Sequence, residues 1–307
     1  MNWRPGRKKS LISKEKDPSG YFGKLLSCAS EGLPPVTLLG EEWLETHMPV
    51  SPEDSNKGTF GKALLLAGSR LYPGAALLAA KACLAGGCGV LTVYSDEAAR
   101  AYFTQLPEAI FRTAEKDTLP ETIISGSDAV GMGPGWGSTP DENAARTALL
   151  SAGKLLIDAD GLNLLSRQPE LKKLLSQRCV LTPHPGEMSR LTGVETSEIV
   201  RDPARFAYRF ACEWGCTVLL KGTCTVVAEP GAIVITAGGN NGLAKGGSGD
   251  VLSGLITAML CRGKEPFEAA CLGSLLLGAG AQKAYTLLKT RLLRASDITD
   301  AIMKGII

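Results

Sequence analysis

A run of small residues that ends in a carboxylate is the part of this sequence best suited to chemistry. Residues 240–254 read NNGLAKGGSGDVLSG, and an apolar segment with helix-forming character begins directly after Asp250. The glycines, among them Gly247 and Gly249, let the backbone turn and bring its N–H groups close to a ligand, and the N-terminus of the following helix adds a positive dipole. The stretch therefore predicts a cradle for an anion.

Asp250 indicates which chemistry this cradle supports. A carboxylate at the rim of a phosphate site is repelled by the phosphate, so its presence favours a base that faces a hydroxyl nucleophile. We therefore predict phosphoryl transfer to a hydroxyl group. The alternative is that Asp250 is an ordinary helix N-cap, because aspartate is common at that position. The stretch matches neither the Walker A pattern, nor the dinucleotide fingerprint, nor the nucleophile elbow.

Four further segments place polar or glycine residues where strands are expected to end. They are GPGWG at residues 133–137, DADGLN at 158–163, TPHPGE at 182–187 and KGT at 221–223. In an open parallel sheet, ligands bind at the carboxyl ends of the strands. We therefore expect these segments to gather around one site.

Each of these segments also has a purely structural interpretation. GPGWG suits the close approach of a ligand, or it is a plain turn. Asp158 and Asp160 suit Mg²⁺ and solvent around a polyphosphate, but capping of the next helix is the favoured interpretation. His184, between two prolines, suits a ligand amide or hydroxyl, or it is a surface histidine at a helix start. Lys221 and Thr223 suit a nucleotide, or they form a solvated hairpin corner.

The composition argues against several classes of protein. A net charge of +2 over 307 residues indicates no nucleic-acid partner. Charged residues, proline and glycines interrupt the apolar stretch between residues 64 and 93, so no membrane partner is expected. With only two histidines, little room is left for a zinc site, and no protein side chains are assigned as metal ligands.

The nine cysteines show no CxxC pair and no disulfide-like spacing. Several lie in apolar runs, namely Cys83, Cys88, Cys212 and Cys271, and are predicted to be small core residues. Together with the absence of a signal-peptide pattern, this usage predicts a soluble protein of the reducing cytoplasm.

Short apolar runs alternate with helical patterns from residue 62 onward. Strands are expected at residues 63–67, 90–94, 129–132, 155–157, 180–181, 217–220, 225–228 and 233–236, and helices at 74–85, 141–151, 169–175, 203–214, 251–261 and 266–288. Continuous apolar strands separated by helices predict an α/β fold with a doubly wound, mostly parallel sheet and helices on both faces. The last two strands are expected to form a hairpin at a sheet edge.

The first fifty residues differ from the rest of the chain. Their first part is basic and poor in apolar residues, and it is followed by GLPPV and a short acidic segment. We therefore interpret residues 1–50 as an N-terminal tail or linker and residues 51–307 as a single domain. A mitochondrial presequence is disfavoured by Glu15 and Asp17.

Taken in order, the motifs resemble those of the ADP/ATP-dependent NAD(P)H-hydrate dehydratases of the ribokinase-like superfamily. The matching segments are KGTFGKALLLAGSRLYPGAALLAAKACLAGGCGVLTV, GPGWG, IDADGLNLL, TPHPGEMSRLTG, KGT and AKGGSGDVLSG, which span about residues 50–290. The ordered set is more specific than any single motif, because related kinases share mainly the GxGD segment. Lys245 and Asn241 depart from the family pattern, in which threonine and proline are frequent.

The resemblance implies a ribokinase-like fold and a metabolite-repair reaction. Hydrated NADH or NADPH, in its S epimer, would be dehydrated at the expense of ADP or ATP, with Mg²⁺ bridging the phosphates. Phosphorylation makes chemical sense here because hydroxide is a poor leaving group and phosphate a good one. Asp250 would receive or orient the hydroxyl proton, although an aspartate with an ordinary pKa near 4 is a weak base.

The resemblance also assigns binding roles by matching motifs. Ala75, Gly135, His184 and Asp250 would contact the hydrated dinucleotide. The adenine nucleotide would be bound by two segments, whose residues are Lys221, Gly222, Thr223, Cys224, Thr225, Gly247, Ser248 and Gly249. The family further implies a homo-oligomer, with tetramers frequent among relatives, and cooperation with an NAD(P)H-hydrate epimerase. The alternatives are a ribokinase-like kinase for a small vitamin precursor and a nucleotide-binding module without turnover.

Overall fold

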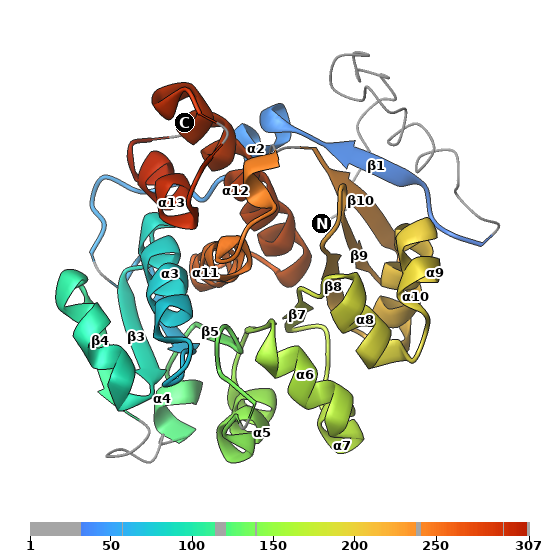
Figure 1. Ribbon diagram of the computed structural model, residues 1–307, viewed down its shortest axis with the longest axis horizontal. Coiled ribbons are helices and arrows are strands. Elements are labelled where there is room, and N and C mark those ends of the chain that lie inside the picture. The colour runs from blue at the N-terminus through green and yellow to red at the C-terminus, as the bar shows by residue number, and fades with distance from the viewer. Residues whose placement is uncertain are drawn as a thin grey trace.

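The computed structural model describes residues 32–56, 58–113, 121–138, 140–237, 241–290 and 292–305. At its centre is a ten-stranded sheet with the order β1-β10-β9-β8-β7-β6-β5-β2-β3-β4 (Figure 1). Neighbouring strands are parallel except for the β8–β9 and β9–β10 pairs, which confirms the mostly parallel sheet. The strands are β1 (Val36–Leu39), β2 (Lys62–Leu66), β3 (Val90–Ser95), β4 (Ala109–Thr113), β5 (Ala129–Met132), β6 (Leu155–Ile157), β7 (Cys179–Leu181), β8 (Thr217–Leu220), β9 (Thr225–Glu229) and β10 (Ala232–Thr236).

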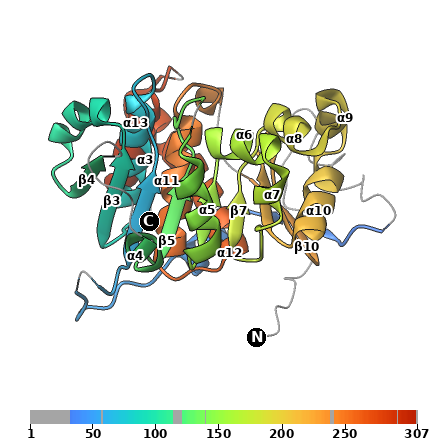
Figure 2. The ribbon, with the colours of Figure 1, turned by 90° about the horizontal axis from the view of Figure 1, so that it is seen from below.

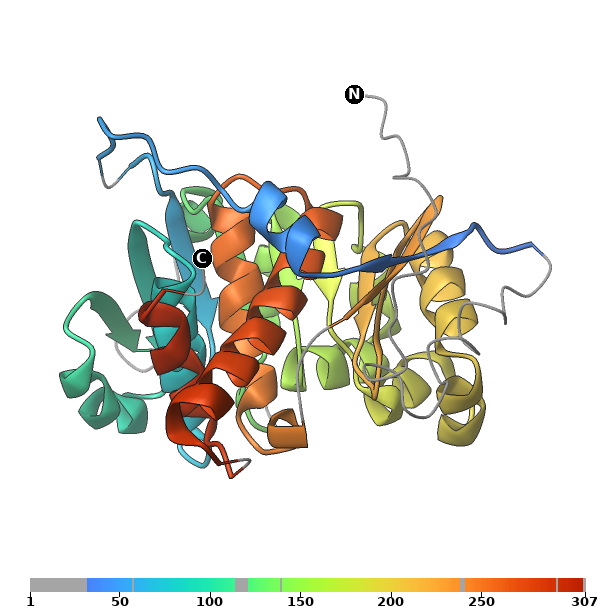
Figure 3. The same cartoon turned by 90° about the horizontal axis from the view of Figure 1, so that it is seen from above.

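Helices cover both faces of this sheet (Figures 2 and 3). One face carries α2 (Glu41–His47), α3 (Pro73–Ala85), α11 (Ser248–Cys261), α12 (Pro266–Leu288) and α13 (Ala295–Met303). The other carries α4 (Glu121–Ser125), α5 (Glu142–Ser151), α6 (Asp160–Arg167), α7 (Pro169–Lys172), α8 (Pro185–Thr192), α9 (Thr196–Arg201) and α10 (Pro203–Trp214). Two short 3₁₀ segments, η1 (Glu97–Gln105) and η2 (Asn241–Leu243), complete the described elements.

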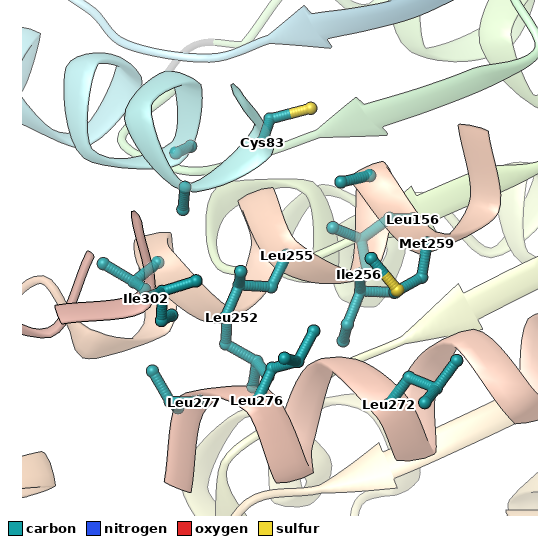
Figure 4. Close-up of a cluster of buried hydrophobic side chains, with 14 of the residues drawn as sticks. Cys83, Leu156, Leu252, Leu255, Ile256, Met259, Leu272, Leu276, Leu277 and Ile302 are labelled. Carbon is teal, nitrogen blue, oxygen red and sulfur yellow. The ribbon is translucent and has the colours of Figure 1, made fainter. Parts of the chain in front are cut away.

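The strands are apolar on both sides because each side meets a layer of helices. In β2, Leu65 belongs to the core beneath α3 and α11, whereas its neighbours Leu64 and Leu66 belong to the core on the opposite face. This alternation follows from the two-residue period of a strand. In the first core, Leu252 and Ile256 of α11 lie beside side chains of α12 (Figure 4).

A glycine contact holds α11 close against α3. A Cβ atom on Gly254 would lie 2.1 Å from the Ala79 carbonyl oxygen and 2.7 Å from the Ala82 Cβ. Only a residue without a side chain allows the two backbones to approach this closely. The contact matters for function because α11 begins with the GGSGD segment, whose position it helps to set.

Residues 36–47 belong to the folded unit, which differs from the interpretation of residues 1–50 as tail or linker. β1 pairs in parallel with β10, from Val36 opposite Ile233 to Leu39 opposite Thr236, and α2 buries Leu44. The β9–β10 hairpin is confirmed, but its edge position is wrong because β1 lies outside it. The part of this segment before residue 32 lies outside the described residues.

The remaining differences concern short elements and one cysteine. β4, α4, α6, α8, α9 and α13 were not predicted, since each has nine residues or fewer and its pattern is too short to recognise. Cys212 is exposed rather than buried, whereas Cys83, Cys88 and Cys271 are buried as expected. Over the ranges that the structure describes, no helix is both long and apolar enough to cross a membrane.

Candidate functional site

Asp250 is the third residue of α11, so it lies in the first turn of the helix and does not cap it. The N-cap is Gly247, which has a left-handed φ of 93°. A Cβ at Gly247 would lie 2.8 Å from Leu78 Cδ1 and 2.9 Å from Ala295 Cβ, so both conformation and space favour glycine there. The alternative interpretation of Asp250 as an ordinary N-cap is therefore wrong.

A buried ion pair lies beside the start of α11. Asp158, which follows β6, is only 1% exposed, and the Lys221 Nζ lies 2.8 Å from its Oδ1. The hydroxyl of Ser253, one turn after Asp250 on α11, donates to the Asp158 Oδ2 over 2.7 Å. A Cβ on Gly249 would lie 3.8 Å from both Asp158 Oδ2 and Lys221 Nζ. The helix N-terminus, the carboxylate and the ammonium thus form one cluster.

The predicted capping role of Asp158 and Asp160 is wrong. The N-cap of α6 is Ala159, whose side chain makes no capping bond. Asp158 is held by Lys221 and Ser253, and Asp160 accepts a hydrogen bond from the Gly137 N–H over 2.7 Å. Asp160 also accepts from the Asn163 side chain of α6, but neither carboxylate caps the backbone N–H groups of that helix.

The backbone between these two carboxylates is strained. Ala159 has φ 47° and ψ −114°, a region that residues with a side chain rarely adopt. Such a conformation costs on the order of 1–3 kcal/mol and persists where the surrounding structure enforces it, often at functional sites. Gly133 contributes to this enforcement, because a Cβ there would lie 1.8 Å from the Asp158 carbonyl oxygen.

The pKa of Asp250 is raised to about 7. Burial is the main cause, since it disfavours the charged carboxylate, and the negative charges of Asp158 and Asp160 add to it, whereas Lys221 opposes it. This value differs from the ordinary one near 4 that was expected from the residue type. A carboxylate that titrates near neutral pH is a better base than an exposed aspartate.

Lys221 retains its positive charge in this cluster. Burial lowers its pKa, but the carboxylates of Asp158, Glu187 and Asp250 outweigh burial and hold the pKa above its usual value. Lys221 begins the connection between β8 and β9, in which Gly222 and Thr223 are exposed and Cys224 is buried. The segment is a hairpin corner, as the alternative interpretation had it, but its lysine is ion-paired rather than solvated.

His184 lies at the start of α8 and acts as its N-cap. Its Nδ1 accepts hydrogen bonds from the N–H groups of Gly186 and Glu187, while the Glu187 carboxylate accepts from the His184 N–H over 2.8 Å. Burial lowers the pKa of His184, with Glu187 opposing and Lys221 supporting this shift. A neutral ring whose Nδ1 accepts carries its proton on Nε2, which lies 3.4 Å from Glu187 Oε1.

Glu187 connects His184 to the charged cluster. Its side chain is 6% exposed and its Oε2 lies 3.7 Å from the Lys221 Nζ. Neither Glu187 nor Ser253 was among the site residues expected from the sequence. The spacing of His184 and Glu187 matches a capping box, a signal that could have placed the glutamate at the helix start. No sequence signal pointed to Ser253, because it looks like any small residue of an apolar helix.

Ala75 and Gly135 contact each other, as expected for two residues of one binding surface. Gly135 has φ 60°, and a Cβ on it would lie 2.5 Å from the Ala75 Cβ and 2.9 Å from the Tyr72 carbonyl oxygen. Ala75 lies in the first turn of α3, and Leu78, one turn later, packs against Gly247. The helix that carries Ala75 therefore packs against the start of α11.

The donor set around Asp250 fits a magnesium ion that is bound mainly by phosphates. Within the described ranges, no three His, Cys, Asp or Glu side chains form a metal-binding group. Asp158 is engaged by Lys221 and Ser253. The other nearby carboxylates are Asp250 and Asp160, and Asp160 accepts one hydrogen bond from the Gly137 N–H and one from the Asn163 side chain. Magnesium in nucleotide sites typically uses one or two carboxylates with phosphates and water, and this arrangement provides them.

Comparisons with known proteins identify the family of this chain. The profile of the family described as NAD(P)H-hydrate dehydratase matches residues 63–304. The ADP-dependent (S)-NAD(P)H-hydrate dehydratase of Bacillus subtilis is 36% identical over 85% of this chain and 97% of its own length. The enzyme of the same name from Neisseria meningitidis is 38% identical over 75% of this chain and 79% of its own.

Longer relatives also match. The chain is 33% identical to the bifunctional NAD(P)H-hydrate repair enzyme of Moorella thermoacetica over 86% of its length, but it spans only 52% of that protein. It likewise spans 50% of the bifunctional repair enzyme of Escherichia coli, so it covers about half the length of these curated relatives.

Solved structures show the same fold. A ribokinase-like superfamily protein from Enterococcus faecalis superposes with a TM-score of 0.78 at 26% identity, covering 88% of this chain and 95% of that one. The ADP/ATP-dependent NAD(P)H-hydrate dehydratase of Bacillus subtilis, co-crystallised with ATP/Mg²⁺, superposes with a TM-score of 0.74 at 32% identity, covering 88% and 97%. The fold is therefore ribokinase-like, and the chain belongs to the NAD(P)H-hydrate dehydratase family.

Proposed function

We propose that the protein converts the S epimer of hydrated NADH or NADPH back to the reduced dinucleotide at the expense of ADP or ATP. The observation that carries this proposal is Asp250, a carboxylate with a pKa of about 7 in the first turn of a helix that begins with glycines. Relatives that this chain covers almost completely bear the name of the same dehydratase, and one of them was crystallised with ATP/Mg²⁺.

In the first step, the hydroxyl oxygen of the hydrated ring attacks the terminal phosphorus of the nucleotide. The new O–P bond forms as the bridging P–O bond breaks, and the hydroxyl proton moves to the Asp250 carboxylate. The N–H groups of Gly247 and Gly249 would face the transferring group together with the positive end of the helix dipole, whereas the Ser248 N–H donates to the Lys245 carbonyl. When bound, Mg²⁺ neutralises phosphate charge and lowers the repulsion that a carboxylate would otherwise cause.

In the second step, phosphate leaves the ring with the electron pair of the C–O bond. A proton is lost from the neighbouring ring carbon, and the two electrons of that C–H bond form the ring double bond. The products are the reduced dinucleotide, phosphate, and AMP or ADP. The buried ion pair of Asp158 and Lys221 takes no proton in this scheme, and it positions the first turn of α11 through Ser253.

The binding roles follow the clusters in the structure. The adenine nucleotide would be bound by the β8–β9 connection, by the first residue of β9 and by the start of α11, with the residues Lys221, Gly222, Thr223, Cys224, Thr225, Gly247, Ser248 and Gly249. Ala75, Gly135 and His184 would bind the hydrated dinucleotide on the other side of Asp250. The contact between Ala75 and Gly135 supports a single surface for that ligand.

The partners and location of the protein are part of the proposal. We infer that a separate NAD(P)H-hydrate epimerase supplies the S epimer, because the longer relatives are named as bifunctional repair enzymes. We also expect a homo-oligomer of tetrameric size, to be measured by light scattering. Eight cysteines of the described chain are free thiols, which suits a reducing cytoplasm.

The direct test is to incubate the purified protein with hydrated NADH, Mg²⁺ and either ADP or ATP, and to follow recovery of the absorbance of the reduced nicotinamide ring. We expect recovery only when a nucleotide is present, with one phosphate released per dinucleotide. A stable phosphoester without recovery would indicate a kinase instead. Absence of both products would overturn the proposal.

A matched pair of variants identifies the base. Asp250→Asn should bind both ligands but lose turnover, whereas Asp300→Asn, which changes an exposed aspartate of α13, should retain it. Full turnover in Asp250→Asn would contradict the assigned role.

A further inference from the structure

Two thiols are in contact at the C-terminal end of α3, away from the proposed active site. Cys83 lies in the last turn of α3 (Figure 4), and Cys88 lies in the connection between α3 and β3. Their Sγ atoms are 3.5 Å apart, and the Cys83 thiol donates to the Cys88 sulfur. Because α3 runs from the end of β2 back to the start of β3, this contact lies at the amino edge of the sheet.

The backbone at the end of α3 holds the two cysteines next to each other. The Cys88 N–H donates to the Cys83 carbonyl over 3.4 Å, and the Gly87 N–H donates to the Leu84 carbonyl over 2.9 Å. Gly87 has a left-handed φ of 86°. These features define a Schellman motif, in which the residue after the left-handed glycine commonly packs against the helix residue five positions earlier. Apolar side chains satisfy that contact, whereas two cysteines can also be linked to each other.

A disulfide fits this place without movement of the backbone. Two cysteines can be joined only when their backbones lie close together and their side chains point toward each other. The hydrogen bond between the Cys88 N–H and the Cys83 carbonyl provides the first condition, and the contact of the sulfur atoms provides the second. Rotation about the side-chain torsions is enough to close the remaining distance.

The two thiols differ in how readily an oxidant attacks them. Cys83 is fully buried, whereas Cys88 is 8% exposed. The hydrogen bond from Cys83 is the main cause of a lowered pKa at Cys88, and Arg262, which donates to the Gly87 carbonyl over 3.2 Å, supports it with its positive charge, although burial opposes it. The same hydrogen bond and burial raise the pKa of Cys83. Because the thiolate is the nucleophile, Cys88 is the thiol that reacts first.

A third thiol nearby is held by a different group. The Cys261 thiol donates to the Phe60 carbonyl over 3.5 Å, and burial, followed by the charge of Cys88, raises its pKa to about 12. It is therefore protonated at neutral pH and does not compete with Cys83 for Cys88. Among the residues that the structure describes, no group of side chains that could hold a metal ion includes these thiols.

We propose that Cys83 and Cys88 form a peroxide-reactive site that is converted reversibly into a disulfide. In the first step, the Cys88 thiolate attacks one oxygen of hydrogen peroxide, the O–O bond breaks, and the hydroxide that leaves takes up a proton to give water. In the second step, the Cys83 sulfur attacks the Cys88 sulfur, the S–O bond of the sulfenic acid breaks, and a second water leaves with the Cys83 proton. The two thiols lose two electrons, which the peroxide gains.

In this scheme Cys83 protects Cys88 from irreversible oxidation. A sulfenic acid without a second thiol can be oxidised further to a sulfinic acid, which thiol reductants do not reverse, whereas a disulfide is reduced again by thiols. A charged sulfinate would be harmful here because the ends of α3 and α11 are tightly packed, and a Cβ on Gly86 would lie 2.5 Å from the Ala258 Cβ. The inference does not depend on the proposed dehydratase reaction.

The test is oxidation of the folded, reduced protein by a small excess of hydrogen peroxide, followed by alkylation of the remaining thiols and peptide mapping with trypsin. Both cysteines fall in the tryptic peptide 82–100, because no lysine or arginine separates them. Its disulfide form lacks two hydrogen atoms, whereas a link to any other cysteine joins two peptides. We expect this disulfide to form at least about tenfold faster than Cys271, a fully buried thiol in the peptide 265–283, is oxidised, and dithiothreitol to reverse it.

Single substitutions separate the roles of the two thiols. In Cys83→Ala, peroxide should leave Cys88 as a sulfenic acid that dimedone traps, and longer exposure should give the sulfinic acid. In Cys88→Ala, Cys83 should remain a thiol at the same peroxide concentration. Cys212→Ala is the matched control, because it removes an exposed thiol of α10, and it should form the disulfide at the wild-type rate.

Several results would overturn the proposal. A cross-link from the peptide 82–100 to another peptide, or oxidation of the pair no faster than that of Cys271, would show that the pair is not the reactive site. Oxidation of Cys83 in Cys88→Ala would contradict the order of the two steps. The oxidised protein should melt at the same temperature as the reduced protein or higher, because the backbone need not move. A lower melting temperature would show that the disulfide distorts the fold, and the pair would not be built for it.

Discussion

The two halves of the carboxyl edge differ in how completely their polar groups are satisfied. On the β6–β8 side, Asp158, Lys221, Glu187 and Ser253 bind one another in a closed set of ion pairs and hydrogen bonds. On the β2–β3–β5 side, the hydroxyls of Ser69 and Ser95 are buried and have no partner in the described chain, and the same is true of the Ser248 hydroxyl at the start of α11.

The difference indicates two ways of preparing a binding site. The β6–β8 half is preorganised, because its charges hold one another in place and shift the pKa of Asp250 before any ligand arrives. The other half retains buried hydroxyls without a partner. We therefore expect substitutions in the first half to affect rate and stability, whereas removal of an unpaired hydroxyl in the second should not lower stability.

The largest expected effect is on the rate of reaction in Asp250→Asn. Removal of a general base typically lowers the rate about 10²–10⁴-fold, and an asparagine of the same shape should leave ligand affinity nearly unchanged. The measurement is kcat for hydrated NADH at saturating nucleotide, beside ligand affinity by calorimetry. A loss in affinity with unchanged kcat would make Asp250 a binding residue only.

The same variant should be more stable than the wild type. Folding raises the Asp250 pKa from 3.8 to about 7, so between these values the folded protein holds a proton that the unfolded chain releases. Stability of the wild type therefore falls as pH rises through this window, and the asparagine variant avoids the loss. The gain in melting temperature should grow from pH 4 to pH 7. A gain that does not depend on pH would have another cause.

Breaking the ion pair between Asp158 and Lys221 should lower the free energy of unfolding. In Asp158→Asn, Lys221 retains only the more distant Glu187, at 3.7 Å, and we expect the free energy of unfolding to fall by about 3 kcal/mol. Denaturant titration measures it. The control is Glu265→Gln, which removes a partner of Lys154 whose side chain is 78% exposed and should cost less than about 1 kcal/mol. Equal losses would mean that Asp158 and Lys221 are no better coupled than a surface pair.

Substitution of two buried serines, one in each half, allows a direct comparison of the two halves. Ser253 is 0% exposed and donates to Asp158, so Ser253→Ala should lower the free energy of unfolding by about 1.5–3 kcal/mol. Ser95 has no partner, and Ser95→Ala should leave that free energy unchanged or raise it by about 1 kcal/mol. Chemical denaturation of both variants checks this. If Ser95→Ala is the more destabilising, the two halves do not differ as described.

The smallest expected effect is a shift in the pH profile. In the wild type, kcat/KM should rise with pH through about 7, as the free enzyme loses the Asp250 proton. Asp160 raises this pKa through its negative charge, so Asp160→Asn should move the acid limb to lower pH. A shift to higher pH would contradict the sign of this interaction.

Much of the fold followed from local patterns, and the long elements were the most predictable. The apolar runs after residue 62 predicted most of the strands, and the 23-residue helix α12 agrees with its expected bounds. β1 was missed because its four residues have no pattern of their own and pair with β10, about 200 positions later in the chain. Local sequence carries no record of such a partner.

Some residues of the site could also be predicted from the sequence, and others could not. The glycines before Asp250 and the position of Lys221 after a strand could be recognised from the sequence, because their residue types have few other uses in that order. The partner of Asp158 could not be recognised from the sequence, because the ion pair joins residues 63 positions apart. The local sequence around Asp158 fitted a helix-capping role equally well.

By itself, the sequence determined which residues are available for chemistry, the order of strands and helices that carries them, and the family to which the motifs point. These are local properties, set by residue type, spacing and the conformational freedom of glycine. Only the tertiary structure decided that Asp250 titrates near pH 7 and that the buried Ser95 hydroxyl is left without a partner. Both depend on which groups from distant strands and helices exclude water from one another, and burial of this kind arises only when the chain has folded.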